Sequence, residues 1–345
     1  MKKNILFILQ HPAHVHQFKN NISFLKNEYN IFVLAIKKDI TTLLLEKINI
    51  RFEALSSSKN GILNKIIDIF PQIKFLNKFL SKNSIDLVVS RGNVAASLIC
   101  GIKGYKHVIF SDSEPVFIDR YLLKLSTKII TPDSYKFNLG KKHLLVNSYK
   151  ELAYLHPNYF KEDIGVYKKL GLNKGDSFYI IRLVSWSANH DVFQNGLNDD
   201  NVDRLIKVLE NSGKVFITSE KKLKQQYKKY QFKIDPFEIH NALYFSKALI
   251  CDSQTMATES ALLATPAIRI NSFVGDNDMG NFRELEDKYK LIYNYSDIND
   301  VIDKINILSK NNNLKEEWII KRKKLLNDKQ DMTLLMNNLI KDIVE

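Results

Sequence analysis

The stretch Cys251-Asp-Ser-Gln-Thr-Met-Ala-Thr-Glu-Ser-Ala-Leu-Leu-Ala-Thr-Pro-Ala-Ile-Arg-Ile270 predicts a strand, a polar turn, a helix and the start of a second strand. The mostly apolar residues 247–251 form the first strand, and residues 256–263 have a helical composition. Pro266 ends the helix, because a proline has no N–H for the helical ladder. A helix that begins directly after a strand presents free N–H groups and its positive dipole end to the sheet edge, where they can bind a phosphate. An ordinary βαβ crossover explains the same pattern.

Four polar side chains of this stretch are candidate substrate-binding residues: Ser253, Gln254, Thr255 and Glu259. Glu259 lies about one turn inside the predicted helix, where a carboxylate can reach the hydroxyls of a sugar such as ribose. His240 lies in a predicted loop before the strand, where it can contact the edge of a nucleobase.

The composition is that of a soluble globular protein with two domains: 345 residues, 45% of them hydrophobic and 26% charged. Residues 5–9 are apolar but are followed by Gln10 and His11, so we expect a buried strand and no signal peptide. Cys100 and Cys251 have apolar neighbours, which predicts buried free thiols in a reducing cytoplasm.

The formal net charge of +13 favours anionic partners, namely nucleic acid, phosphorylated substrates or an anionic membrane face. No apolar run approaches the roughly 20 residues that span a bilayer. The sequence also lacks the signature of a nucleic-acid-binding module and the spacing of a zinc site. We therefore expect no nucleic-acid partner.

Short apolar runs alternate with amphipathic stretches in the first half of the chain. The predicted strands are residues 5–9, 31–35, 52–55, 87–90 and 107–110, and the predicted helices between them are residues 16–26, 40–48, 63–82 and 93–102. This alternation predicts an α/β fold with a parallel sheet covered on both faces. Such sheets bind ligands at the carboxyl ends of their strands.

Polar residues follow three of these strand ends: His11, His14 and His16 after the first, Arg91 after residues 87–90, and Asp112 and Glu114 after residues 107–110. Because histidine titrates near the working pH, one of the three histidines is a candidate general base or phosphate donor, and we prefer His14. Asp112 or Glu114 can instead deprotonate an acceptor hydroxyl, and helix capping is the structural alternative for either. The histidines have no nearby cysteine or carboxylate, so we expect no metal.

A second alternating series follows a linker near residues 155–160. Arg182 leaves the apolar strand 178–181 and can form a bidentate bond with a phosphate. Its alternative role is an ion pair with a carboxylate such as Asp191. Three further candidate substrate-binding residues follow strands of this series: Ser185, Trp186 and Ser219. The expected domains are residues 1–158 on the acceptor side and residues 159–325 for donor binding, with a C-terminal helix at residues 326–345. The chain from Asn294 onward is expected to be mostly helical.

Five motifs together resemble the DUF354 family over roughly residues 1–295. They are Leu9-Gln-His-Pro-Ala-His14-Val-His16, Ser111-Asp-Ser-Glu114, Asn147-Ser-Tyr-Lys-Glu151-Leu-Ala-Tyr-Leu-His156, Ile181-Arg182-Leu-Val-Ser185-Trp186 and Asp252-Ser-Gln-Thr255-Met-Ala-Thr-Glu259. That family is similar to GT-B glycosyltransferases and to non-hydrolysing UDP-N-acetylglucosamine 2-epimerases. The resemblance implies two facing Rossmann-like domains, an interdomain cleft, a donor held mainly by the second domain, and a C-terminal helix that crosses back to the first.

The chain departs from the family pattern at two places. Asp252, Ser253 and Gln254 stand where the family usually has glycines, and Leu183 stands where it usually has proline. Side chains at 253 and 254 keep the backbone farther from a phosphate, or replace backbone bonds with hydroxyl and amide bonds.

The combined expectation is a metal-independent GT-B glycosyltransferase that needs no cofactor. Its donor is a nucleotide-linked or otherwise phosphorylated sugar. Its acceptor is a glycan or a lipid-linked molecule of surface polysaccharide synthesis, so the protein is cytoplasmic with peripheral contact at the inner membrane face. The first alternative is a UDP-sugar 2-epimerase or hydrolase on the same fold. The second is a non-catalytic protein that binds anionic glycans or nucleic acid.

Overall fold

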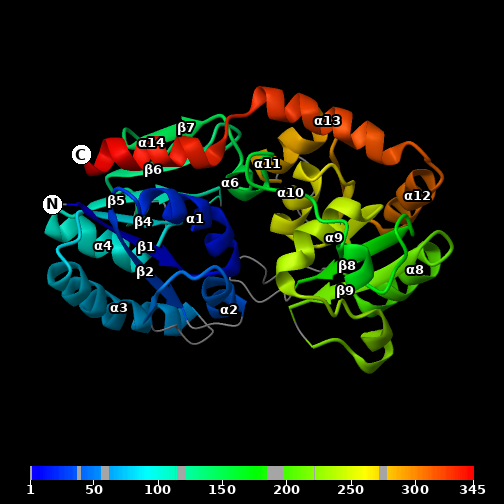
Figure 1. Ribbon diagram of the computed structural model, residues 1–345, viewed down its shortest axis with the longest axis horizontal. Coiled ribbons are helices and arrows are strands. Elements are labelled where there is room, and N and C mark those ends of the chain that lie inside the picture. Colours follow the sequence, from blue (N-terminus) through cyan, green and yellow to red (C-terminus); the bar gives the residue numbers. More distant parts are fainter. Residues whose placement is uncertain are drawn as a thin grey trace. The chain divides into compact units, whose positions relative to one another are not determined.

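The computed structural model describes residues 2–36, 40–55, 62–112, 114, 122–184, 197–220, 222–271 and 278–345, with the backbone alone for residues 62–68. The chain divides into two compact units (Figure 1). The first unit contains Met1–Tyr159 and Lys329–Glu345, and the second contains Phe160–Asp328. Each unit is built around its own parallel sheet.

The elements of the first unit are β1 (Asn4–Leu9), α1 (Pro12–Leu25), β2 (Asn30–Ile36), α2 (Ile40–Lys47), β3 (Glu53–Leu55), α3 (Ile62–Lys82), β4 (Leu87–Ser90), α4 (Val94–Lys103), β5 (Lys106–Phe110), β6 (Lys128–Pro132), β7 (His143–Val146), α6 (Leu152–Leu155) and the C-terminal α14 (Met332–Val344). The sheet has the strand order β3-β2-β1-β4-β5-β6-β7, and its paired strands are parallel. Six of these strands follow the order of a Rossmann fold.

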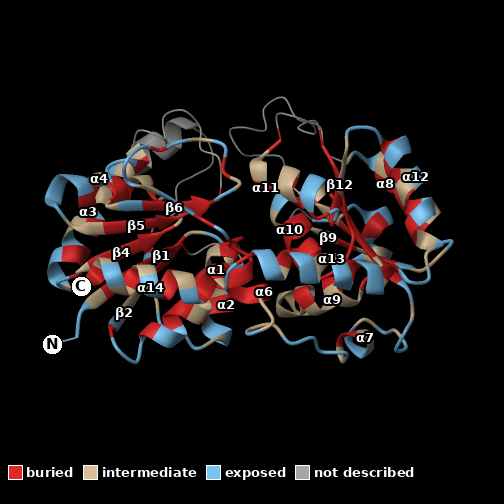
Figure 2. Ribbon diagram, turned by 90° about the horizontal axis from the view of Figure 1, so that it is seen from above, coloured by how far each residue is buried: buried red, intermediate tan, exposed pale blue. Residues whose placement is uncertain are grey.

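The side chains of β1 alternate between the two faces of the first sheet. Leu6 and Ile8 share a hydrophobic cluster with Leu76 of α3. Phe7 packs on the other face against Phe18 of α1, with ring centroids 5.6 Å apart. Figure 2 shows α3 and α4 on one side of the buried strands and α1 and α14 on the other. The prediction of a parallel sheet covered on both faces is confirmed.

The elements of the second unit are α7 (Val166–Lys169), β8 (Phe178–Leu183), α8 (Asp199–Leu209), β9 (Lys214–Ser219), two 3₁₀ turns (Gln225–Tyr230 and Pro236–Glu238), α9 (Ile239–Phe245), β10 (Ala248–Cys251), α10 (Gln254–Leu262), β11 (Ala267–Ile270), α11 (Gly280–Arg283), a π-helical turn (Glu284–Lys288), β12 (Ile292–Tyr295), α12 (Ile298–Ser309) and α13 (Leu314–Asp328). The strand order is β12-β11-β10-β8-β9, again parallel. Buried Trp318 fixes α13 by donating its indole N–H to the Leu291 carbonyl at 2.9 Å.

The structure corrects several element boundaries. α1 begins at Pro12 and not at residue 16, because His11 caps it and a proline suits the first position of a helix. Asn294 was expected to begin the helical tail, but it lies in β12, on the edge of the second sheet. Strands β6 and β7 were not predicted, since both are short and β7 exposes two of its four residues.

Candidate functional site

In each sheet, candidate residues gather where the order of the strands reverses. The first sheet builds outward from β1 through β2 to β3 and then resumes with β4 on the other side of β1. In the second sheet, β9 pairs with one edge of β8, and the next strand along the chain, β10, pairs with the other edge of β8. Open α/β sheets bind their ligands in the crevice at such a switch point. His11 follows β1 and Arg91 follows β4, whereas Arg182 and Cys251 are register partners of β8 and β10.

Asp112, directly after β5, is held between two cations of the first unit. Arg91 binds one carboxylate oxygen and Lys150 binds the other, and all three side chains are at least nine-tenths buried. Burial alone raises the pKa of Asp112, but Lys150 and Arg91 outweigh it and hold that pKa below its ordinary value. Asp112 is therefore a fixed anion that orients the two cations.

Glu151 contacts the ammonium group of Lys150, as Asp112 does. Its Oε1 lies 2.9 Å from Lys150 Nζ, and the residue is only 1% exposed. Burial raises the pKa of Glu151 to about 7. The Lys150 charge lowers this pKa and the Asp112 charge raises it, but both effects are smaller than that of burial. A buried carboxyl with such a pKa exchanges a proton near neutrality.

The hydrogen bonding of His14 fixes its tautomer. Its Nδ1 accepts the backbone N–H of Gln10 at 3.2 Å, so the proton of the neutral ring sits on Nε2. Burial, followed by the charges of Arg91, His11 and Lys150, holds the pKa of His14 well below its ordinary value of 6.5. His14 is thus a neutral hydrogen-bond donor at neutral pH.

The other residues predicted in the first unit are more scattered. His11 caps α1, where its Nδ1 accepts the N–H of Ala13 at 3.2 Å. The ring of His16 is buried on α1 and packs on Tyr154 of α6, with centroids 5.3 Å apart. Glu114 is half-buried and accepts a long bond of 3.4 Å from the backbone N–H of Lys136.

A buried polar network holds the turn that carries Arg91. Ser90 Oγ accepts the N–H groups of Gly92 at 3.1 Å and of the residue after it at 3.3 Å. Because Ser90 Oγ already accepts two bonds, its hydroxyl donates to Nε2 of His107 at 2.9 Å. Nδ1 of His107 then carries the ring proton and donates to Ser126 Oγ at 3.0 Å. Burial lowers the pKa of His107 to about 3, so its ring stays neutral and the network keeps this direction.

In the second unit, α10 begins at the switch point with amide groups available to a ligand. Ser253 is the N-cap, and its Oγ accepts the N–H of Met256 at 3.4 Å. Within the described residues, no acceptor is found for the amides of Gln254 and Thr255, which are the first two of the helix. The Gln254 side chain is exposed and that of Thr255 is half-buried, so both line the open end of α10.

Arg182 is the penultimate residue of β8, in register with Cys251 of β10, and it is paired within the unit. Its guanidinium donates to Thr218 Oγ1 at 3.1 Å and to Glu220 at 2.9 Å, so its ion-pair partner is Glu220. Asp191, the alternative partner considered from the sequence, lies outside the described residues, as do Ser185 and Trp186. Ser219 is half-buried at the end of β9, in register with Leu183.

Glu259 and His240 form a buried pair. His240 lies in α9 and not in a loop, and its Nε2 is 3.1 Å from Glu259 Oε1. Their side chains are 8% and 7% exposed, respectively. The imidazole thus fixes one oxygen of the carboxylate that we expect to meet sugar hydroxyls.

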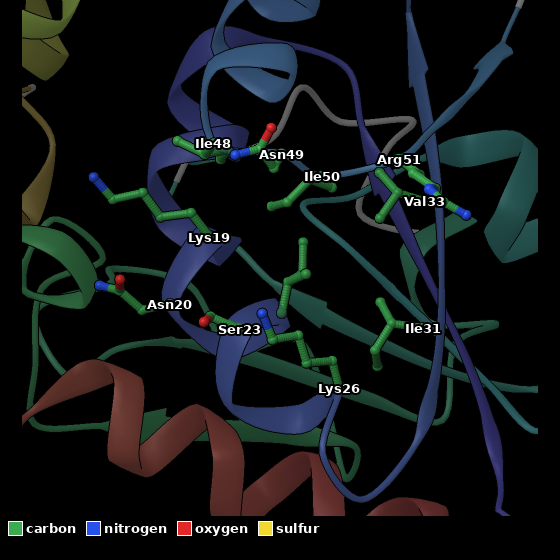
Figure 3. Close-up of a pocket in the computed structure, with 11 residues that line it drawn as sticks. Lys19, Asn20, Ser23, Lys26, Ile31, Val33, Ile48, Asn49, Ile50 and Arg51 are labelled. Carbon is green, nitrogen blue, oxygen red and sulfur yellow. The ribbon is translucent and has the colours of Figure 1, made fainter.

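Two described cavities lie away from these residues, at the amino-terminal edges of the sheets. The first, of about 360 Å³, lies between α1, β2 and the end of α2. Figure 3 shows Ile31 and Ile50 on two sides of this cavity and Lys26 extending toward Ser23. The second, of about 480 Å³, lies beside Lys315 of α13. Since ligands of parallel sheets bind at the carboxyl ends of strands, we place the site at the switch points.

The described part of the chain contains no three His, Cys, Asp or Glu side chains grouped to hold a metal ion. Cys100 and Cys251 are free and buried as predicted, and burial raises the pKa of each thiol to about 12. Among the described residues, no helix is both long and apolar enough to cross a membrane.

Sequence reasoning missed three charged residues that the structure brings to the strand ends. Lys150 and Glu151 were visible as opposite charges beside the apolar run Leu152–Leu155. Arg269 was visible as a charge inside an apolar strand. It is fully buried, donates to Asp278 at 2.7 Å and lies over the Phe282 ring at 3.6 Å from its centroid.

Several solved structures share this architecture. A putative UDP-N-acetylglucosamine 2-epimerase from Listeria monocytogenes is similar with a TM-score of 0.70 at 12% identity, covering 100% of this chain and 96% of its own. The glycotransferase of kitacinnamycin gives 0.66 at 8%, covering 100% of both chains. The UDP-GlcNAc 2-epimerase from Neisseria meningitidis bound to UDP-GlcNAc gives 0.65 at 12%, covering 99% of both. These likenesses show a two-domain, Rossmann-like GT-B fold.

No curated protein matches the sequence. A family model described as "Protein of unknown function (DUF354)" matches residues 4–345. The chain therefore belongs to the DUF354 family.

Proposed function

We propose that the protein is a metal-independent glycosyltransferase that takes its sugar from a nucleotide-linked donor without a cofactor. The observation that carries the proposal is the start of α10, where the amides of Gln254 and Thr255 have no acceptor within the described residues. They lie at the switch point of the second sheet, beside Arg182. Fixed N–H groups and a guanidinium stabilise a leaving diphosphate electrostatically.

The Glu259–His240 pair supports a sugar-nucleotide ligand over a simple phosphate. The bond from His240 occupies one carboxylate oxygen of Glu259 and fixes its orientation. A carboxylate held in this way can accept hydrogen bonds from the two hydroxyls of a ribose. Ser253 and Gln254, which replace the usual glycines, add a hydroxyl and an amide for phosphate oxygens.

In the proposed reaction, an acceptor hydroxyl attacks the anomeric carbon of the donor sugar. The bond from that carbon to the phosphate oxygen breaks, the nucleoside diphosphate leaves, and a base takes the hydroxyl proton. Of the three predicted bases, His14 carries its proton on Nε2, and Asp112 is committed to two cations. This leaves Glu114, which is half-buried just after β5, as the base that we favour.

Nucleotide binding tests the proposal. UDP, GDP, CMP and dTDP are titrated into the full-length protein by calorimetry and by thermal shift, since a ligand stabilises the native state by mass action. We expect one nucleotide to bind, with at least tenfold loss in Glu259→Gln and in Arg182→Met. Arg204→Met, which removes a half-buried arginine of α8 in the same unit, is the matched control. Equal affinity in all three variants would refute the donor site.

An epimerase on the same fold uses the same donor site, and two of the structural neighbours are such enzymes by name. Incubation of the preferred nucleotide sugar without an acceptor separates the activities. A transferase leaves the sugar unchanged over many minutes, whereas turnover to an epimer or to free sugar identifies the alternative. If neither nucleotides nor their sugars bind, the protein is better explained as a non-catalytic binding protein.

We further propose that the acceptor is a glycan or lipid-linked molecule of surface polysaccharide synthesis, met at an anionic membrane face from the cytoplasm. The cavity of Figure 3 supports this, because it has an aliphatic lining and three cations, Lys19, Lys26 and Arg51, with no acidic residue. Anionic membranes attract such surfaces by about 1 kcal/mol per basic residue.

Co-sedimentation with phosphatidylglycerol vesicles tests this contact. We expect the triple substitution of Lys19, Lys26 and Arg51 by glutamine to lower vesicle binding. Substitution of the exposed α3 residues Lys74, Lys78 and Lys82 removes the same charge and is the control. An equal loss in both triple variants would show that only net charge matters.

A further inference from the structure

The N-terminus of α1, at the switch point of the first sheet, has its first amides already used. Pro12 has no N–H, Ala13 donates to the His11 side chain at 3.2 Å, and His14 donates to the His11 carbonyl at 2.9 Å. α10 of the second unit, in contrast, leaves its first two amides without an acceptor in the described residues. A ligand at the first switch point must therefore be recognised by side chains.

The side chains at the first switch point offer N–H donors in a region of positive charge. His14 is left with its Nε2–H for a ligand, because Nδ1 is taken by Gln10. Arg91 uses one terminal nitrogen for Asp112, and its Nε is buried with no hydrogen-bond partner in the described structure. Arg91 and Lys150 are also two of the charges that depress the pKa of His14, so both lie close to its ring.

The charges of this cluster leave room for one more anion. Arg91 and Lys150 carry two positive charges against the single fixed negative charge of Asp112. Glu151 is the remaining acidic group on Lys150, and it holds its proton up to about neutral pH, since burial raises its pKa to about 7. Buried cations are stable when an anion balances them.

We propose that the first unit binds an oxyanion of the acceptor, a phosphate or a carboxylate, through His14 Nε2–H and Arg91, with Lys150 completing the positive field. The inference deepens the proposed function and rests on it, because it defines the acceptor as a molecule with an anionic group near its reactive hydroxyl. The neutral His14 ring and the Arg91 guanidinium both donate N–H groups. Their hydrogen bonds to an oxyanion are charge-assisted and therefore stronger than bonds to a neutral oxygen.

The Ser90–His107 network supports this assignment. It consists of buried hydrogen bonds that end on the turn residues on either side of Arg91. A surface arginine needs no such support, whereas a ligand-binding guanidinium must be held in one position before the ligand arrives.

Three sugars with the same ring test the site: methyl glucoside, which is neutral, glucuronate, which has a carboxylate, and glucose 6-phosphate. Each is titrated into the full-length protein by calorimetry. We expect at least one charged sugar to bind tenfold to a hundredfold more tightly than methyl glucoside, as for one or two charge-assisted hydrogen bonds. The preferred charged sugar identifies the oxyanion as phosphate or carboxylate.

Variants locate the binding. Arg91→Met and His14→Leu should reduce the affinity of the charged sugar to that of methyl glucoside, while His14→Gln, which keeps an N–H donor, should retain most of it. Lys78→Met, at an exposed position of α3 in the same unit, is the control. Equal binding of neutral and charged sugars, or a Lys78→Met loss as large as that of Arg91→Met, would overturn the assignment.

Nucleotide binding is measured on the same samples. A variant that has lost the charged sugar but keeps nucleotide binding and its circular dichroism spectrum is folded, so its loss is local. Failure of every charged sugar with intact nucleotide binding contradicts this inference alone. Failure of nucleotide binding contradicts the proposed function.

Discussion

Substitution of Glu151 by glutamine should make the stability of the first unit less dependent on pH. Glu151 is buried to 1% exposure beside Lys150, and its carboxyl has a pKa of about 7 instead of the ordinary 4.5. The folded state therefore binds the proton more tightly than the unfolded state does. The contribution of this group is fully present below pH 4.5 and is lost as the pH rises through 7.

The magnitude follows from the shift between the two pKa values. Each unit of difference corresponds to about 1.4 kcal/mol, so the wild type should lose about 3 kcal/mol between acid pH and pH 8 through this group. Glutamine has the shape of the protonated carboxyl and does not titrate. The Glu151→Gln variant should therefore match the wild type near pH 5 and exceed its stability by about 2–3 kcal/mol at pH 8.

Urea denaturation from pH 5 to pH 8 measures the difference. Both tryptophans, Trp186 and Trp318, lie in the range of the second unit, so fluorescence follows that unit while far-ultraviolet circular dichroism follows both. A transition seen by circular dichroism alone belongs to the first unit. Glu46→Gln, at an exposed position of α2, is the control and should show no such trend.

The opposite trend would refute the reasoning. If Glu151 is ionised at neutral pH and its attraction to Lys150 exceeds the cost of burial, the glutamine variant becomes less stable than the wild type as the pH rises. Such a result would also remove the excess positive charge from the Arg91–Asp112–Lys150 cluster.

Three further predictions concern stability. His107→Phe leaves two buried serine hydroxyls without their partner and should cost about 2–4 kcal/mol by urea denaturation, and no loss would contradict the directed network. Asp331→Ala removes the N-cap of α14 and the carboxylate that accepts from Tyr159 Oη at 2.8 Å. We expect the free energy of unfolding to fall by about 2–4 kcal/mol and the melting temperature to drop. The control Asp342→Ala, at an exposed site of the same helix, should change neither. Phe18→Ala should cost about 3–5 kcal/mol, because its fully buried ring packs against Phe7 and Phe110, and Phe18→Leu should recover most of it.

Much of the fold could be predicted because its signals are local. Apolar runs such as residues 5–9, 87–90 and 248–251 are strands, and the residues between them have helical compositions. Proline and capping residues end or begin helices through contacts within a few positions. The missed strands β6 and β7 are short. β6 has only two consecutive aliphatic residues and ends in a proline, and β7 exposes two of its four residues, so neither has a clear hydrophobic pattern.

The candidate site was predicted as a set of positions but not as an arrangement. His240 and Glu259 were named separately, and the structure joins them at 3.1 Å. Arg182 was expected to meet a phosphate, and the structure gives it Glu220 as a neighbour. Their roles in catalysis and binding stay predictions for the experiments above.

The sequence by itself determined which residues follow the ends of strands, because side-chain periodicity and turn chemistry depend on near neighbours. Only the tertiary structure decided which strands are adjacent, and hence that His11 and Arg91 flank one switch point and Arg182 and Ser253 another. It also decided that Lys150 serves both Asp112 and Glu151. Ion pairs and pKa values depend on burial and on charges far apart in the chain, which no local pattern records.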